Sequence, residues 1–375
     1  MRQVTTRITL TFDACLTPGT YYTYQQYYIH GLKATEGIDF RISPVTSQIL
    51  ADLRDAKSAG AQWIWNKHVK LNAKHRYLES NHVGRYNVSF GPHHLRLAID
   101  IADTRNIRDM NSLNWCDIYF KANKWPSLEY PKKVYPIVNG NGKLDPEKIR
   151  IIKAHRSTEK TLDLVYLSKL WSRPDSFENV LEHQVRIFEM LAKLDCTKRL
   201  LAVVPANSKQ QLKEYLHRLD SAGVEWTEGW GSITSTHFWN TLAAAKVVFQ
   251  RSGNHHCISW RMTDLLCMGA CIVMDKAPHP QWPVPLEHGK HFVDCRCGFE
   301  PDFSIPDKQQ YNSIRKNIEC LLNDDQAQDR YRQNCRTYFD ANASPQKVAA
   351  YLLRTIKAHA DTSANINDIP RSTSG

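Results

Sequence analysis

Several features that define well-known protein classes are missing from this sequence. It contains no run of about 18 apolar residues, so no membrane-spanning helix is expected. The first residues, MRQVTTRITLTFD, lack the apolar core of a signal peptide, and we therefore predict a cytoplasmic protein. Neither the G-x-G-x-x-G fingerprint of dinucleotide-binding proteins nor the G-x4-G-K-S/T loop of P-loop NTPases occurs. These two absences argue against a dinucleotide cofactor and against a P-loop NTPase.

Cysteine is present, but its spacing fits neither a disulfide scaffold nor a zinc site. Ten cysteines are scattered over 375 residues, which is typical of reduced thiols in a reducing compartment. The closest pair is Cys295 and Cys297, and His255, His256 and Cys257 precede it. Because no C-x2-C pair occurs, we predict buried or incidental thiols and no metal site.

Positive charge is in excess. The chain has 49 Lys and Arg against 38 Asp and Glu, a formal net charge of +11, and should favour anionic partners. The basic residues form no block of five or more, and no RNP-like aromatic motif occurs, so specific nucleic-acid binding is not expected. The charge instead favours a basic rim around an anionic substrate, or peripheral contact with an anionic membrane surface.

The second half of the chain alternates short apolar runs with amphipathic segments. Helical spacing of apolar residues follows Ser176, Ser208, Thr236 and Ser259. Strands are predicted between these helices, at Leu162–Leu167, Leu200–Pro205, Val224–Trp226, Lys246–Gln250 and Ala270–Asp275. Short connections in such an alternation imply βαβ crossovers, so we predict a parallel sheet with helices on both faces, a Rossmann-like domain.

The first half also has an α/β pattern. Its predicted elements are a strand at Arg7–Phe12, a helix at Tyr21–Leu32 and strands at Tyr86–Phe90, Leu95–Ile101 and Asp117–Lys121. The segment Pro136–Pro146 has the Gly, Asn and Pro content of a linker. We therefore predict an N-terminal domain over 1–140, a second domain over 141–343, a C-terminal helix over 344–360 and a disordered tail over 361–375.

The stretch SWRMTDLLCMGACIVMD, Ser259–Asp275, carries the strongest functional signal. Ser259 is suited to cap the helix, and Arg261 would then lie in its first turn, where a cation opposes the helix macrodipole by about 0.3–1 kcal/mol. The preceding loop follows a strand, and open α/β sheets bind ligands at the carboxyl ends of their strands. A diphosphate between Arg261 and the helix would explain the arginine. Asp264, one turn on, could hold two ribose hydroxyls; the alternative is a surface Arg–Asp pair.

Here the sequence resembles the donor half of GT-B glycosyltransferases, most closely the exostosin-like branch and the bacterial capsule and lipopolysaccharide enzymes. The matching residues are Ser259, Arg261, Asp264 and Gly269, followed by KAPHPQWPVPL and HGKHFVD. The resemblance covers about half the chain. It implies a nucleoside-diphosphate sugar in a cleft between two Rossmann-like domains, with Arg261 on the diphosphate and Asp264 on the ribose or the sugar. It also implies a C-terminal helix that crosses back to the first domain, for which Pro345–Ile356 is the candidate.

Two departures from related enzymes narrow the chemistry. Retaining members of this group carry two glutamates eight positions apart, whereas the matching positions here are His256 and Asp264, which favours inversion. GT-A enzymes hold a divalent ion through a D-x-D motif, and none occurs. We therefore predict transfer without a metal or other cofactor, in which arginine, lysine and helix ends neutralise the diphosphate.

Other candidate residues follow from position. An inverting enzyme needs a base on its acceptor side, and Asp100 and Asp103, in and after an apolar strand, are the candidates, with a capping or turn aspartate as the alternative. Asp13 and His30 are acceptor-side candidates; the tyrosines around His30 could stack on a sugar or pack in a core. Donor-side candidates in two loops are Arg173, Ser252, Gly253, Asn254, His255 and His256.

The sequence thus predicts a glycosyltransferase that moves a sugar from a nucleotide donor to a saccharide or lipid-linked acceptor. Surface polysaccharide assembly, with peripheral contact at the inner face of the membrane, is the expected setting. Two other functions remain open from the residues alone. One is a non-catalytic protein that binds nucleotides or other anions, and the other is a sugar-nucleotide epimerase.

Overall fold

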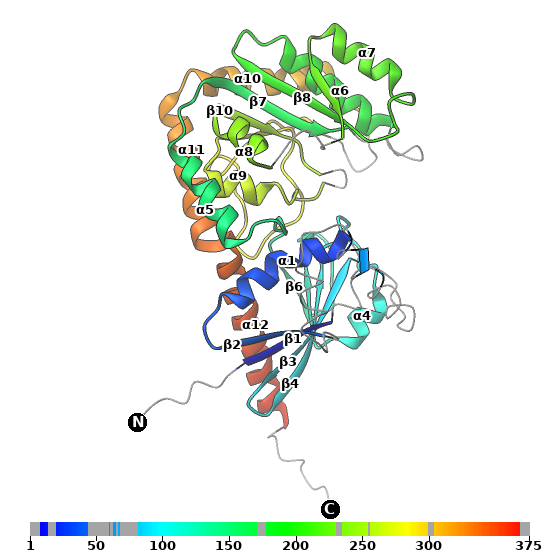
Figure 1. Cartoon of the computed structure of the whole chain (residues 1–375), viewed down its shortest axis with the longest axis vertical. Helices are drawn as coiled ribbons and strands as arrows, with labels where there is room; N and C mark the ends of the chain where they lie inside the picture. The colour runs from blue at the N-terminus through cyan, green and yellow to red at the C-terminus, as the bar shows by residue number, and fades with distance from the viewer. Residues whose placement is uncertain are drawn as a thin grey trace, which may run out of the picture. The chain divides into compact units, whose positions relative to one another are not determined.

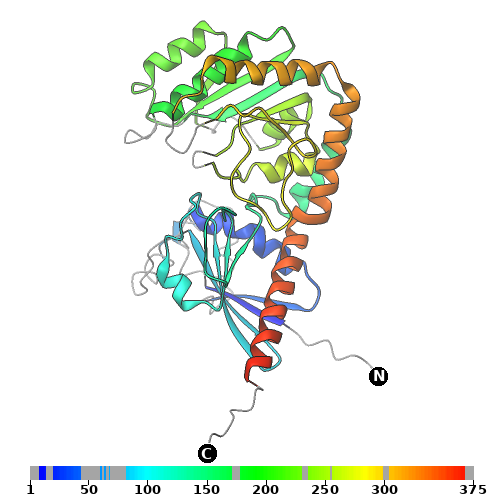
Figure 2. The same cartoon turned by 180° about the vertical axis from the view of Figure 1, so that it is seen from behind.

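The computed structural model describes residues 8–13, 20–43, 60, 63–64, 67, 82–170, 178–229, 235–253, 256–298 and 304–367. The chain forms two compact units (Figures 1 and 2). Unit 1 consists of Met1–Lys148, Pro280–Pro285 and Ala341–Gly375, and unit 2 of Ile149–His279 and Leu286–Asp340. The first division therefore follows Lys148, eight residues after the predicted boundary at 140, and Pro280–Pro285 belongs to unit 1.

Unit 2 contains a six-stranded sheet in which all neighbouring strands are parallel. Its order is β12-β11-β10-β7-β8-β9. This is the Rossmann order, in which two wings extend from the first strand in opposite directions. The predicted Rossmann-like fold is therefore confirmed. The strands are β7 (Leu162–Lys169), β8 (Lys198–Val204), β9 (Glu225–Glu228), β10 (Ala245–Gln250), β11 (Ile272–Met274) and β12 (Val293–Asp294).

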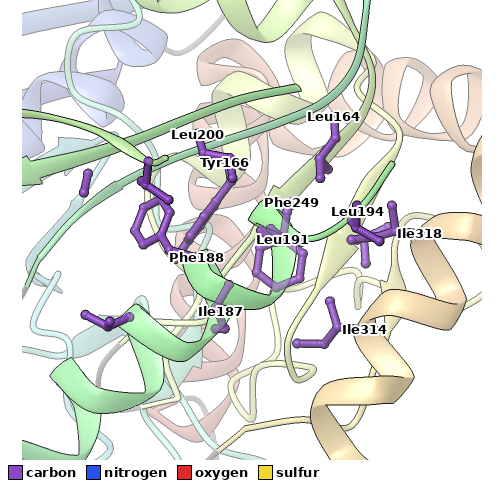
Figure 3. Packing of buried hydrophobic residues seen from close by; sticks show 14 of the residues in the cluster. Leu164, Tyr166, Ile187, Phe188, Leu191, Leu194, Leu200, Phe249, Ile314 and Ile318 are labelled. Atoms are coloured by element: carbon purple, nitrogen blue, oxygen red, sulfur yellow. The ribbon is translucent and has the colours of Figure 1, made fainter. Parts of the chain in front are cut away.

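One face of this sheet packs on an apolar core formed with α6 (Glu178–Ala192), α7 (Lys213–Ser221) and α10 (Lys308–Leu322). Figure 3 shows Tyr166 of β7 among side chains from neighbouring elements. Its ring centroid lies 4.5 Å from that of Phe188 and 5.1 Å from that of Phe249. Each such buried side chain contributes about 1.5–3 kcal/mol to folding. The remaining helices of unit 2 are α8 (Ser235–Ala243), α9 (Met262–Met268) and α11 (Asp325–Tyr338).

Unit 1 contains a mixed six-stranded sheet with the order β2-β1-β3-β4-β5-β6. Only β3 is antiparallel to its neighbours, so the other five strands end at the same edge. The sequence pattern predicts four of these strands and misses β2 and the three-residue β6. The strands are β1 (Ile8–Asp13), β2 (Ile38–Ser43), β3 (Val83–Phe90), β4 (His93–Asp100), β5 (Ile118–Lys121) and β6 (Val134–Pro136), with a short helix α4 (Met110–Trp115).

The C-terminal helix α12 (Pro345–Asn367) packs against α1 (Thr20–Lys33) in unit 1, as both views of the chain show (Figures 1 and 2). The contact is close because Gly31 has no side chain: a Cβ there would lie 2.0 Å from the carbonyl oxygen of Pro345. This confirms the predicted return of the C-terminal helix to the first unit. The helix runs to Asn367, past residue 361, where the sequence predicts a disordered tail to begin.

The predicted linker Pro136–Pro146 is packed into unit 1 instead of lying exposed. Residues 137–142 are buried, and a Cβ at Gly140 would lie 2.1 Å from the Tyr27 ring. Tyr28 lies beside Tyr27 on α1, and its hydroxyl donates to the Val138 carbonyl at 2.9 Å. These two tyrosines are therefore core residues, and the chain enters unit 2 within the following helix, α5 (Pro146–Ala154).

Among the helices in the described ranges, none has the length and apolarity needed to span a bilayer.

Replacing Gly31 by alanine should separate α1 from α12. Its new methyl group would overlap the Pro345 carbonyl, and overpacking of this kind costs about 1–3 kcal/mol, more than alanine gains over glycine in a helix. Thermal unfolding followed by circular dichroism should show a lower midpoint for Gly31→Ala. Lys33→Ala, an exposed change on the same helix, is the control; equal midpoints for the two variants would contradict the close contact.

Candidate functional site

The strand order of unit 2 marks one place where a ligand site is expected. β7 and β10 are neighbours, and the two wings of the sheet start from them in opposite directions. In open α/β sheets the crevice beyond the carboxyl ends of such a strand pair is the usual ligand site. The described residues that follow these strands include Leu170 after β7 and Arg251, Ser252 and Gly253 after β10.

Arg261 reaches this edge of the sheet. Its backbone N–H donates to the Ser259 hydroxyl at 3.3 Å, and α9 begins one residue later, so Arg261 precedes the helix instead of lying in its first turn. The guanidinium Nη1 donates to the Leu167 carbonyl of β7 at 2.5 Å, and its central carbon lies 5.0 Å from the centroid of the Phe238 ring. The arginine is thus directed toward the end of β7, and α9, at seven residues, contributes only a small dipole.

Asp264 lies inside unit 2 beside this arginine. Its side chain is closed to solvent, at 1% exposure, and accepts a hydrogen bond from Nε1 of Trp239 on α8 at 3.3 Å. Burial lowers the pKa of the Arg261 guanidinium and the negative charge of Asp264 raises it, so the two side chains are electrostatic partners. The alternative of a surface Arg–Asp pair is therefore wrong. Contact of Asp264 with a ribose stays a prediction, one that its burial does not favour.

The described residues of the loop after β10 are closely packed. The Gly253 N–H donates to the Cys257 carbonyl at 3.0 Å, and a Cβ at Gly253 would lie 2.1 Å from the Cys257 sulfur. His256 has a φ of 54°, and its buried ring lies 5.0 Å from the ring of His279. Ser252 is also buried. These residues therefore shape the loop, while Asn254, His255 and Arg173 lie outside the described residues.

Arg251 is a candidate site residue that the sequence pattern does not single out. It directly follows β10, and its charge acts on the buried Tyr166 of β7. Burial raises the pKa of Tyr166, and the positive charges of Arg251 and Arg261 both lower it. The charges of two arginines from separate segments therefore act on one tyrosine of β7. The available signal was a charged residue at the first position of a loop that follows an apolar strand.

The carboxyl edge of the unit 1 sheet holds the predicted base Asp100, but in a closed position. Its side chain is 1% exposed. Oδ2 accepts from the Lys121 ammonium at 3.0 Å and from the Tyr119 hydroxyl at 2.9 Å, and Oδ1 accepts from the Ala102 N–H at 2.8 Å. A general base must reach the hydroxyl whose proton it removes. The geometry therefore makes Asp100 an internal counter-ion for Lys121 and does not favour it as a base.

Asp103 and His82 are the more accessible titratable groups at this edge. Asp103 is exposed in the loop after β4, and Nδ2 of Asn123 lies 3.5 Å from its Oδ1. His82 precedes β3 and is half-buried, and its carbonyl accepts from the Ile101 N–H. Burial lowers the pKa of His82 and Asp100 raises it, with a net decrease that favours the neutral imidazole a base requires. The sequence gives no periodic signal for His82.

Of the remaining predicted residues, Asp13 and His30 belong to unit 1, and Cys295 and Cys297 to unit 2. Asp13 is the last residue of β1 in unit 1. His30 lies in the last turn of α1, where burial lowers its pKa and Asp145 raises it. Cys295 and Cys297 are buried, and burial raises the pKa of both thiols. Within the described part of the chain, no three His, Cys, Asp or Glu side chains are grouped so as to hold a metal ion.

Removing the partner of Asp100 should destabilise unit 1 strongly. Lys121→Met leaves a carboxylate buried without its counter-ion, which costs about 3–5 kcal/mol. The double variant Asp100→Asn, Lys121→Met should be less destabilised, because it buries no unpaired charge. Chemical denaturation would measure both. Arg96→Met breaks the exposed Arg96–Asp117 pair and should cost at most about 1 kcal/mol. A loss for Lys121→Met as small as that of the control would rule out a stabilising ion pair.

No family model and no curated protein matches the chain. Solved structures similar to it include Anabaena HepE with UDP and glucose, at 13% identity and a TM-score of 0.43, over 66% of this chain and 65% of that one. Another is a glycosyltransferase from Rickettsia africae, at 12% identity and 0.40, over 65% and 63%. A third is WaaG, a glycosyltransferase involved in lipopolysaccharide biosynthesis, at 11% identity and 0.39, over 89% and 95%.

The first of these likenesses is partial, since the chain spans about 65% of the length of HepE. Identities of 11–13% do not carry residue roles from one chain to another. The fold is instead established by the chain's own strands: a Rossmann order in unit 2, a mostly parallel sheet in unit 1 and a C-terminal helix returned to unit 1. In this architecture and in the residues Ser259, Arg261, Asp264 and Gly269, the chain resembles GT-B glycosyltransferases.

Proposed function

We propose that the protein is a glycosyltransferase whose unit 2 binds the diphosphate of a nucleotide-sugar donor beyond the carboxyl ends of β7 and β10. Two observations support the proposal: Arg261 donates to the Leu167 carbonyl of β7, and Arg251 directly follows β10, with both charges acting on Tyr166. Sheets with this strand order bind ligands at that crevice. The sequence motif that ends at Gly269, with its resemblance to donor halves, supports the same position.

The chemistry of sugar transfer explains why two arginines would be needed at this position. When the bond between the sugar and the diphosphate breaks, negative charge develops on the leaving oxygen, and preorganised positive groups stabilise it. A guanidinium is planar and can bind phosphate oxygens through two parallel N–H donors, which a lysine cannot do. Asp264 offsets the burial of Arg261 and so helps to keep this side chain charged at the edge of the sheet.

We infer that unit 1 binds the acceptor, a saccharide or a lipid-linked saccharide. An inverting reaction needs a base for the acceptor hydroxyl, and Asp103, with His82 as the second candidate, is the base we propose. The net charge of +11 supports anionic substrates and a peripheral contact with an anionic membrane surface. Surface polysaccharide assembly, without a metal or other cofactor, is the setting that the sequence motif supports.

Nucleotide binding tests the diphosphate site directly. Since a hydrogen bond to a charged group contributes about 1.5–3 kcal/mol, Arg251→Ala and Arg261→Ala should each weaken binding of the best nucleoside diphosphate by about tenfold or more. Titration calorimetry with UDP, GDP and dTDP would measure this, with CMP as a monophosphate comparison. Arg199→Ala, which breaks an exposed pair with Glu225 elsewhere in unit 2, is the control and should bind normally.

Arg261 also bonds to β7, so unfolding midpoints of the free variants must accompany the titration. Arg261→Lys keeps the charge but loses the planar fork and should bind between the alanine variant and the wild type. Unchanged affinity in a variant that lacks both Arg251 and Arg261 would refute the diphosphate site.

Product analysis then separates transfer from the other functions. With a nucleotide sugar and a saccharide acceptor, the wild-type protein should release free nucleoside diphosphate, and Arg261→Ala should release at least about tenfold less at saturating donor. Binding without release for any donor and acceptor would favour the non-catalytic anion-binding protein. A changed sugar that is still attached to its nucleotide, formed without an acceptor, would favour the epimerase.

A further inference from the structure

A chain of buried polar groups crosses unit 2 and ends at the loop that carries Arg251. The hydroxyl of Tyr311 on α10 lies 2.7 Å from Nδ1 of His183 on α6. The other ring nitrogen of His183, Nε2, lies 3.4 Å from Oδ2 of Asp275, the residue after β11. Oδ1 of Asp275 accepts from the backbone N–H of Ser252 at 2.8 Å. Three elements of the fold are thereby linked to one amide of the loop.

The positions of the protons on these linked polar side chains follow from which atoms can donate and which can only accept. An ionised carboxylate only accepts hydrogen bonds, so Nε2 of His183 must carry the proton that faces Asp275. In a neutral imidazole Nδ1 then accepts, and the Tyr311 hydroxyl donates to it. Burial lowers the pKa of His183, Asp275 raises it and Arg251 lowers it, for a net decrease that agrees with the neutral ring. One ring nitrogen of His183 therefore donates a hydrogen bond, and the other accepts one.

Stability of the fold alone does not explain why polar groups are buried here. His183 is 0% exposed and Asp275 1% exposed, and Tyr311 packs in the apolar core cluster of unit 2. A buried polar group without its full set of partners costs about 1–3 kcal/mol by mutational data, and an apolar side chain at position 183 would avoid that risk. A complete buried network instead fixes a single arrangement of the segments it joins.

The segment fixed here is the backbone around Arg251. The Asp275 carboxylate holds the Ser252 and Lys276 amides at 2.8 Å each, which ties the end of β11 to the loop after β10. On the other side, the side-chain amide of Gln250 donates to the Arg251 carbonyl at 2.7 Å. Arg251 is therefore held from both neighbours, and its charge reaches both His183 and Tyr166.

We propose that His183 and Tyr311 are positioning residues for the diphosphate site: through Asp275 they hold the Ser252 amide and thereby the backbone from which Arg251 extends. This inference rests on the proposed function, since it assumes that Arg251 binds the donor. Neither His183 nor Tyr311 contacts the ligand. Their effect is on affinity, through the geometry of the loop.

Paired substitutions at position 183 test the link. His183→Gln can still donate from its terminal amide toward Asp275, whereas His183→Asn is one methylene shorter and cannot reach it. Titration with UDP and with inorganic pyrophosphate should give on the order of tenfold weaker binding for His183→Asn, as losing a residue that orients a ligand-binding group typically does. His183→Gln should recover most of the affinity, and Tyr311→Phe should lose about two- to tenfold, since one neutral hydrogen bond contributes roughly 0.5–1.5 kcal/mol.

A control separates positioning from a general loss of stability. Gln328 is another buried polar residue of unit 2, bonded to the Leu321 carbonyl and to Arg332. Gln328→Leu should lower the unfolding midpoint without changing affinity. All titrations are made well below the lowest midpoint in the series, so that unfolded protein does not contribute.

The outcomes distinguish this inference from the function on which it rests. If wild-type protein binds neither nucleoside diphosphates nor pyrophosphate, the proposed function fails. If the wild type binds and Arg251→Ala weakens binding, but His183→Asn binds like the wild type, the positioning role is overturned. It is also overturned if His183→Gln binds as weakly as His183→Asn, or if Gln328→Leu loses as much affinity as they do. If His183→Asn does not fold, unchanged affinity in Tyr311→Phe overturns it.

Discussion

The pairing of β7 with β10 is the constraint on which the rest of unit 2 depends. Ala245 lies opposite Leu162 and Val248 opposite Val165, so two strands that are far apart in the sequence end together. Because the order of the sheet reverses at this pair, the loops that follow separate in opposite directions. The pairing places Arg251, which follows β10, beside the end of β7, to whose Leu167 carbonyl Arg261 donates. Sheet topology thus places two arginines from separate segments at the β7–β10 pair, where the donor diphosphate is proposed to bind.

Buried carboxylates have a common structural role in both units. Asp100 ends β4 and is held by Lys121 and Tyr119, while Asp275 follows β11 and is held by His183 and two backbone amides. A buried charge is tolerated only when donors surround it. An aspartate after an apolar strand can therefore be a framework residue as readily as a catalytic one, and the number of donors around it distinguishes the two cases.

Local composition did not predict burial. The Gly, Asn and Pro content of Pro136–Pro146 predicts a linker, yet the Tyr27 ring packs at Gly140. The tyrosines of α1 were open to either a stacking or a core role, and the contacts of Tyr27 and Tyr28 assign those two to the core. Composition indicates the backbone conformation that a segment adopts. The side chains that bury the segment come from elements distant in the chain.

The sequence by itself determined the alternation of strands and helices, the Rossmann-like second unit, the return of the C-terminal helix and the segment that holds Arg261. The alternation, the second unit and the Arg261 segment follow from apolar periodicity and short motifs, which are local properties of the chain. The return of the C-terminal helix was implied by the resemblance to GT-B glycosyltransferases. Tertiary structure decided that Asp264 and Asp100 are buried, that the charges of Arg251 and Arg261 both act on Tyr166, and that His183 and Tyr311 connect to the loop after β10. The reason is physical: the energy of a charged side chain depends on the groups around it in space, and these come from strands and helices that only the folded sheet brings together.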